Sequence, residues 1–222
     1  MPQTKSNMNE QTLMAIACLT AYLLGSIPSS VWIGKAFFGV DVREHGSGNA
    51  GATNTLRVLG KPAGFTVLFL DFLKGFIAAS LVFWPGFMLN SNHIIEFKML
   101  FGALAVVGHI YPVFAGFRGG KGIATVIGVV AGMDWMLALA CFITFVIIVA
   151  ITKYISVGSM LSGLISPLYA GLIHHWQEIN LVYFCAVVGV LVVYTHRSNI
   201  KRLRKGEESR FSLTKKPTQV KS

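Results

Sequence analysis

The chain alternates between long stretches without charged residues and short segments rich in charge, glycine or proline. An α-helix rises about 1.5 Å per residue, so about 20 residues are needed to cross the core of a bilayer. Six uncharged stretches approach or exceed that length, and each is expected to form a membrane-spanning helix. They are residues 11–34, 75–95, 99–117, 135–152, 154–177 and 179–196.

The segment just before residue 75 is apolar as well, although it contains two charged residues. Its hydrophobic character begins near Gly64, which extends the second span towards the N-terminus. Asp71 and Lys74 stand three positions apart, so a helix places them on one face. We expect the two side chains to pair, which lets a membrane helix tolerate both charges.

A further apolar stretch, residues 122–133, is short and decides the topology. If it crosses the membrane, the chain has seven spans, and 16 of its 19 Lys and Arg residues fall in loops or a tail on one face. If it is re-entrant, everything after it changes side. The positive-inside rule favours seven crossings. We therefore predict an all-α polytopic membrane protein with seven transmembrane helices, the N-terminus outside and the C-terminus in the cytoplasm.

This topology divides the chain into three parts. Residues 1–11 form a short external segment, residues 12–196 a seven-helix catalytic domain, and residues 197–222 a basic cytosolic tail. The cytosolic loops that carry recognisable motifs are residues 39–64, 117–125 and 153–159.

Composition agrees with a membrane protein and excludes two other classes. Hydrophobic residues make up 54% of the chain and charged residues 13%, about half the charged content of soluble proteins. A soluble domain or a disordered chain is excluded. Nine of the 19 cations follow His196, and beside a membrane span they indicate an anchor on anionic lipid rather than a nucleic-acid-binding surface.

The first cytosolic loop contains the sequence GSGNAGATN, residues 46–54. Glycines allow backbone amides to close on an anion, and small hydroxyl and amide side chains add hydrogen-bond donors. The alternative is a glycine-rich turn that caps the next helix, and the sequence leaves both open. The candidate binding residues are Gly46, Ser47, Gly48, Asn49, Thr53 and Asn54.

The second loop reads GGKGIAT, residues 119–125, and a helix is expected directly after it. Free amides, the helix dipole and one ammonium group would then point at the same place, as in phosphate sites. It is not a Walker A loop, because Gly rather than Ser or Thr follows the lysine. A basic loop that only obeys the positive-inside rule is the alternative. The candidates are Gly119, Gly120, Lys121, Gly122 and Thr125.

His196 and Asn199 stand three positions apart at the membrane surface and would share one helical face. His196 is a candidate general base, or a structural hydrogen-bonding residue at a helix end. No cluster of His, Cys or paired carboxylates with metal-ligand spacing is present on the inner face, so no metal and no cofactor are expected. A serine-hydrolase elbow is absent too.

Four segments in order resemble the bacterial membrane glycerol-3-phosphate acyltransferases that use acyl phosphate. They are GSGNAGATN, GHIYPVFAGFRGGKGIAT, KYISVGS and HRSNIKRLRKGEE. The resemblance runs from about Leu24 to Phe211, and the seven-helix bundle of that family, N-terminus out and C-terminus in, agrees with the topology above. It implies acyl transfer to the 1-hydroxyl of glycerol-3-phosphate, which gives lysophosphatidate and phosphate in the first acylation of phospholipid synthesis.

The resemblance also implies roles for individual residues. Ser47 and Arg57 would contact a substrate phosphate or the acyl group, and Lys121 would hold a phosphate together with the amides of residues 119–122. Ser159, His196 and Asn199 would complete the polar site, and Glu207 would act as a structural clasp. The expected catalytic residues are therefore Ser47, Arg57, Lys121, Ser159, His196 and Asn199.

The implied partners are acyl phosphate, glycerol-3-phosphate and membrane lipid, with no nucleic acid, and we expect a monomer in the bacterial inner membrane whose active site faces the cytoplasm. The proton acceptor is either His196 or the substrate's own phosphate. The alternative function is a transporter for an organic phosphate, although no pair of matching broken helices suggests an inverted repeat.

Overall fold

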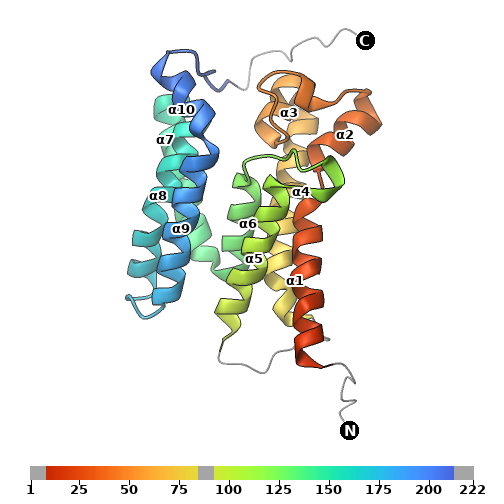
Figure 1. The fold of residues 1–222 in the computed structure, drawn as a ribbon. Helices are drawn as coiled ribbons and strands as arrows, with labels where there is room; N and C mark the ends of the chain where they lie inside the picture. The colour runs from red at the N-terminus through yellow and green to blue at the C-terminus, as the bar shows by residue number, and fades with distance from the viewer. Residues whose placement is uncertain (1–8, 85–92, 213–222) are drawn as a thin grey trace.

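The computed structural model describes residues 9–84 and 93–212. Within those ranges all the regular secondary structure is helical, and loops connect the helices. Residues 1–8, 85–92 and 213–222 lie outside the described residues. They include most of the predicted N-terminal segment and the end of the predicted basic tail. Long helices run side by side along one axis (Figure 1). They are α1 (Glu10–Ser26), α4 (Lys61–Ser80), α5 (Ile94–Ile110), α6 (Ile123–Met133), α7 (Trp135–Thr152), α8 (Ile155–Ile173) and α9 (Ile179–Thr195).

Three shorter helices gather at one end of this bundle, which we call the loop end. They are α2 (Ser29–Phe38), α3 (Ala52–Leu59) and α10 (Arg197–Arg204). Single 3₁₀ turns occupy Val42–Glu44, Leu81–Phe83 and Val113–Ala115. The first described helix starts at the opposite end of the bundle from α10 (Figure 1).

Four of the described helical segments are long and apolar enough to cross a membrane, and two bent helix pairs raise that number to six. The bent pairs are α1 with α2, at 44°, and α9 with α10, at 55°. The protein is thus an integral, multi-pass membrane protein. α6 is a shorter apolar helix of 11 residues, so the seventh crossing and the orientation of the termini stay predictions.

The predicted first span differs from the observed one. The uncharged stretch 11–34 was expected to be a single helix, but it breaks at Ile27 and Pro28 into α1 and α2. Proline has no amide hydrogen and disfavours helical geometry in the residue before it. The segment expected as the first loop, residues 39–64, contains the helix α3. α4 begins at Lys61 rather than near Gly64.

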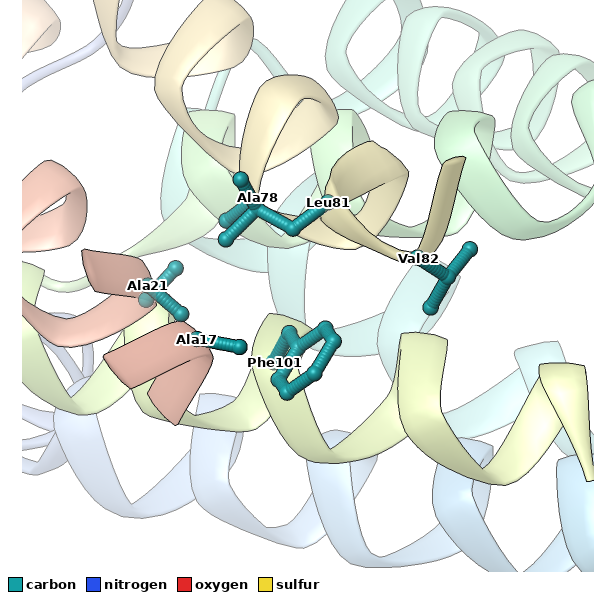
Figure 2. Packing of buried hydrophobic residues seen from close by; sticks show 7 residues of the cluster. Ala17, Ala21, Ala78, Leu81, Val82 and Phe101 are labelled. Carbon is teal, nitrogen blue, oxygen red and sulfur yellow. The ribbon is translucent and has the colours of Figure 1, made fainter. Parts of the chain in front are cut away.

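Small residues let the helices approach closely. A buried cluster of α1, α4 and α5 combines Ala17, Ala21 and Ala78 with the fully buried ring of Phe101 (Figure 2). α4 and α6 also lie close together, since a Cβ atom at Gly75 would come within 2.2 Å of the Thr125 carbonyl oxygen. Such contacts are typical of membrane helix interfaces, and this one fixes the start of α6 against the middle of α4.

Candidate active site

The first loop, residues 39–51, is folded around one buried amide. Asn54, in the first turn of α3, accepts hydrogen bonds at Oδ1 from the Ser47 amide (2.8 Å) and hydroxyl (3.1 Å). Its Nδ2 donates to the carbonyl oxygens of Val42 (2.8 Å) and His45 (3.0 Å). All polar atoms of Asn54 are therefore engaged within the loop, and its side chain shapes the loop that carries the exposed Ser47.

Two glycines in this loop have the left-handed backbone that its tight turns require, Gly46 at φ 61° and Gly48 at φ 71°.

The side chain of Asn49, in the same loop, has an unsatisfied acceptor. Its Oδ1 is buried and has no hydrogen-bond partner. A buried acceptor without a partner costs free energy, which is consistent with its predicted place in a binding site. Thr53 is exposed at the start of α3.

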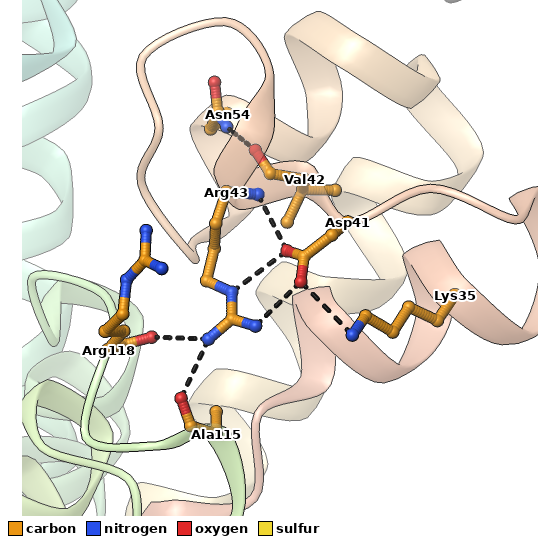
Figure 3. Close-up of polar contacts among 7 residues, drawn as sticks. All are labelled: Lys35, Asp41, Val42, Arg43, Asn54, Ala115 and Arg118. Atoms are coloured by element: carbon orange, nitrogen blue, oxygen red, sulfur yellow. Dashed lines mark hydrogen bonds and ion pairs between the residues drawn. The ribbon is translucent and has the colours of Figure 1, made fainter.

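An ion pair ties this loop to the second loop, residues 111–122. The carboxylate of Asp41 accepts hydrogen bonds from Arg43 Nε (2.9 Å) and Nη2 (2.7 Å), and Lys35 lies 3.3 Å away (Figure 3). Arg43 Nη1 donates across to the carbonyl oxygens of Ala115 (2.8 Å) and Arg118 (3.5 Å). Hydrogen bonding to Arg43 holds the pKa of Asp41 well below its usual range, so this clamp is charged at physiological pH.

The second loop turns back on the end of α5 before it enters α6. The Gly120 amide donates to the His109 carbonyl oxygen (3.2 Å), and Gly122 precedes α6 with φ 80°. No side chain caps the start of α6 in this described segment, so the amides of its first turn are available to an anion. Thr125 does not face that opening, because it is fully buried and its hydroxyl shares a hydrogen bond with His109 Nδ1 (3.1 Å).

Lys121 connects the second loop to α10. Its Nζ donates to Asn199 Oδ1, and Asn199 Nδ2 in turn donates to Glu208 Oε1 (2.6 Å). Glu208 also accepts from Ser156 Oγ (2.8 Å) and from Arg202 Nε (2.7 Å). Lys121 and Asn199, two of the predicted site residues, are thus brought together from positions 78 residues apart.

The predicted clasp is displaced by one residue. Glu207 was expected to serve as the clasp, but its side chain is exposed, and Glu208 makes the contacts. The chain leaves α10 through Gly206, which has φ 72°. This left-handed turn directs the second of the two adjacent acids, not the first, back towards α8 and α10.

Cations surround this carboxylate. Burial lowers the pKa of Lys121 to about 8; Glu208 opposes that shift, while Arg202 and Arg57 add to it. Burial also lowers the pKa of Arg57, which interacts with the charges of Glu208 and Arg202. One carboxylate thus stands among three cations, and the excess of positive charge suits an anionic ligand.

His196 and Ser159 are buried beside this region. His196 lies at the junction of α9 and α10, 2% exposed, and its Nδ1 is 2.8 Å from the Val192 carbonyl oxygen. A carbonyl oxygen can only accept, so Nδ1 carries the hydrogen and Nε2 is the acceptor of a neutral ring. Ser159 is 3% exposed, and its hydroxyl donates to the Ile155 carbonyl oxygen (3.0 Å).

Ser159 also lines an apolar cavity of about 60 Å³ between α6, α8 and α9. Its other walls come from Ile123 and Val126 of α6 and from Val188 and Val192 of α9. The cavity has room for a few water molecules and is too small for a long hydrocarbon tail. Among the described residues, no group of three or more His, Cys, Asp or Glu side chains could hold a metal ion.

Comparison with known proteins identifies this arrangement. Residues 15–206 match the family described as glycerol-3-phosphate acyltransferase. The chain belongs to this family. The glycerol-3-phosphate acyltransferase of Listeria monocytogenes is 44% identical over 198 residues, which cover 89% of this chain and 96% of the relative. That of Staphylococcus saprophyticus is 41% identical over 202 residues, covering 90% and 98%.

Solved structures of family members agree with the fold. PlsY (YgiH), an integral membrane glycerol 3-phosphate acyltransferase, was crystallised in a glycerol 3-phosphate form that is 42% identical to this chain. The match covers 90% of this chain and 96% of the PlsY chain, with a TM-score of 0.79. The lysophosphatidic acid form is 41% identical with the same coverage and a TM-score of 0.76.

The sequence analysis did not identify several residues whose contacts hold the candidate site together. Asp41 and Glu208 were given no role in the site, although each has an arginine within six residues. That spacing was the available signal. Ser156 carried no signal, because its partner Glu208 lies in a distant segment.

Proposed function

We propose that this protein transfers an acyl group from acyl phosphate to the 1-hydroxyl of glycerol-3-phosphate, and forms lysophosphatidate and phosphate. The observation that carries the proposal is the convergence of Asn199 and the charge of Arg57 on Lys121, which lies in the glycine-rich second loop at one end of the bundle. Relatives solved with glycerol 3-phosphate and with lysophosphatidic acid support the acceptor and the product. The charge excess supports two phosphate-bearing substrates.

The residues hold and orient the two substrates. Lys121 and the amides of the second loop bind one phosphate, while Arg57 and Ser47 bind the other phosphate or the acyl group. The 1-hydroxyl oxygen attacks the acyl carbon, the bond from that carbon to the phosphate oxygen breaks, and phosphate leaves. Because phosphate is a good leaving group, positioning and charge stabilisation supply most of the acceleration.

The proton of the attacking hydroxyl goes to a phosphate oxygen of the substrate. His196 Nε2, Ser159 and Asn199 orient the reacting groups, and the hydrogen bond of His196 to Val192 fixes the direction of the ring. His196 as general base is the rival assignment. The remaining members of the site are Gly46, Gly48 and Asn49 of the first loop and Thr53 and Asn54 of α3. They are joined by Gly119, Gly120 and Gly122 of the second loop and Thr125 of α6.

The acyl tail of the donor lies in lipid between the helices, as its apolar character favours, while the polar head meets the loop end. The carbonyl group then lies at the loop end, beside Lys121, and the tail runs towards the middle of the membrane. We propose that the protein acts as a monomer.

The catalytic domain, residues 12–196, crosses the bacterial inner membrane seven times, with a short external segment 1–11 and a cytosolic tail 197–222. Two observations support this: α1 starts at the end of the bundle opposite α10 (Figure 1), and the loop end carries most of the Lys and Arg residues that the structure describes. α4, α5 and α7 contact α6 and shelter it, as so short a helix needs. The active site faces the cytoplasm.

The test uses purified protein in detergent or lipid, with acyl phosphate and labelled glycerol-3-phosphate. Lysophosphatidate should form without added metal and with EDTA present, because the proposed anion sites consist of amides and cations. Acyl-coenzyme A should not replace acyl phosphate. A requirement for Mg²⁺, or equal use of the coenzyme A ester, would contradict the proposal.

A further inference from the structure

A buried polar cluster lies below the proposed site. Apart from Thr125, a predicted site residue, its members have no part in the reaction described above. It consists of Ser29, Asp71, Lys74, His109 and Thr125, from α2, α4, α5 and α6. Each is at most 6% exposed. Charged residues inside a membrane bundle are costly, and where they persist they usually serve function.

The centre of the buried cluster is the ion pair of α4. Asp71 Oδ1 is 2.9 Å from Lys74 Nζ, the pairing that their spacing predicts. Two further contacts reach the break between α1 and α2. Lys74 Nζ donates to the Ile27 carbonyl oxygen (2.8 Å), and Ser29 Oγ donates to Asp71 Oδ1 (3.0 Å). The ion pair therefore fixes the bend from which α2 leads into the first loop.

The other side of the buried cluster supports the second loop. His109 Nδ1 lies 3.8 Å from Asp71 Oδ1 and shares a hydrogen bond with Thr125 (3.1 Å). The carbonyl oxygen of His109 accepts the Gly120 amide, and its ring lies directly beneath this glycine. A Cβ atom at Gly120 would come within 2.3 Å of His109 Nε2, so the ring packs closely against the backbone of the loop.

The space beside these groups is too small for a substrate. Ser29, Asp71, Lys74, His109, Gly119 and Gly120 line a cavity of about 10 Å³, which is the room needed by one water molecule. A phosphate group cannot enter. The buried cluster thus acts on the site through backbone and ring contacts and does not bind substrate.

We infer that Asp71, Lys74, His109 and Thr125 are positioning residues, which hold the second loop in its anion-binding shape and align it with the first loop. Because Lys121 follows Gly120 directly, a shift of the loop moves both the amides and the ammonium of the proposed phosphate site. The inference rests on the proposed function for its kinetic effect. Its structural part, a loop held by His109 and Thr125, can be measured without turnover.

The test removes one hydroxyl and no charge, because an unpaired buried charge would endanger folding. Thr125→Val keeps the volume of the side chain but cannot hold the His109 ring. Amide hydrogen–deuterium exchange of a peptide covering residues 117–123 should become faster, and kcat/KM should fall on the order of 10–100-fold. Thr125→Ser should restore both. The matched control is Thr144→Val, which removes a hydroxyl bonded to Tyr169 in another helix pair (2.7 Å) and should change neither.

Each other outcome is informative. Wild-type exchange and kinetics in Thr125→Val would overturn the inference. A lower kcat/KM with unchanged exchange would mean that Thr125 touches substrate directly, and would overturn it as well. Faster exchange throughout α7–α9 would show general destabilisation instead of loop positioning, and would contradict it.

If Thr125→Val does not fold, His109→Leu fills the same space beneath Gly120 without polar atoms and should give the same local change. Wild-type loop exchange in that variant would refute the inference. Absence of acyl transfer by the wild-type protein would refute the proposed function alone, because the exchange of residues 117–123 would still decide whether the buried cluster holds the loop.

Discussion

The ammonium of Lys121 lies where the second loop meets α10, with Asn199 as its hydrogen-bond acceptor. Lys121→Ala removes this charge and leaves the glycine amides in place. A single preorganised donor of this kind is worth about 10²–10³ in turnover, so kcat should fall by that factor in a steady-state assay. Lys61→Ala, an exposed lysine on the same end, should stay within about twofold. Near-normal activity of a folded Lys121→Ala protein would refute the phosphate-loop assignment.

The same lysine predicts the pH dependence. Burial lowers its pKa to about 8, so the cation that holds phosphate is present below this pH and is lost as the pH rises above it. A profile of kcat/KM against pH should therefore show an alkaline limb near pH 8. Lys121→Arg should move this limb to higher pH, because a guanidinium keeps its charge. If the limb stays at the same pH in Lys121→Arg, another group titrates there.

At the residue scale, the sequence indicated candidate glycines and cations for the site but not how their partners are arranged. Lys121 and Asn199 were expected in one site, and the structure joins them. The choice between Glu207 and Glu208 depends on the left-handed turn at Gly206, which leaves no trace in the identity of two adjacent acids. The roles predicted for the individual site residues, from Ser47 to Asn199, stay predictions.

The two loops act as one element because Arg43 binds both. Its guanidinium pairs with Asp41 on one side and donates to Ala115 and Arg118 carbonyl oxygens on the other (Figure 3). A lysine retains the charge but cannot span both sides, since it lacks the planar fork. Arg43→Lys loses at least one charge-assisted hydrogen bond, so kcat/KM should fall about 10-fold or more.

The matched control for this clamp is Arg118→Lys. Only the backbone carbonyl of Arg118 contacts Arg43, so replacing its side chain should leave kcat/KM within about twofold. Equal losses in both variants would show that positive charge on this face, rather than the clamp, determines activity.

Helix boundaries were predictable where a charge ends an apolar stretch, and less so elsewhere. The short helix α6 was expected at residues 122–133 and occupies Ile123–Met133. The break at Pro28 was missed because neither side of it carries a charge. α3 was missed because GATNTLR combines helix-capping residues with the features of a flexible loop, and only the buried contacts of Asn54 decide between them.

The neighbours of each helix in the whole bundle are not encoded locally. Asp71 and His109 meet although they lie 38 residues apart, and that contact follows from the glycine-mediated approach of α4 and α6 and the packing of α5 beside them. Composition and span length established a multi-pass membrane protein. The side of the membrane on which each end lies depends on whether α6 crosses.

Cysteine labelling in intact cells decides this point, in a background where Cys18, Cys141 and Cys185 are replaced. Gln177→Cys lies between α8 and α9, and Lys205→Cys follows α10 at the opposite end of the bundle; both positions are exposed. With seven crossings, an impermeant thiol reagent should label Gln177→Cys in intact cells and Lys205→Cys only after permeabilisation. Lys61→Cys, which precedes α6, is the internal reference and should behave like Lys205→Cys. If α6 is re-entrant, Lys205→Cys and Gln177→Cys exchange their labelling while Lys61→Cys stays protected. The basic tail and the second loop would then face opposite sides of the membrane, and the contact of Lys121 with Asn199 could not form.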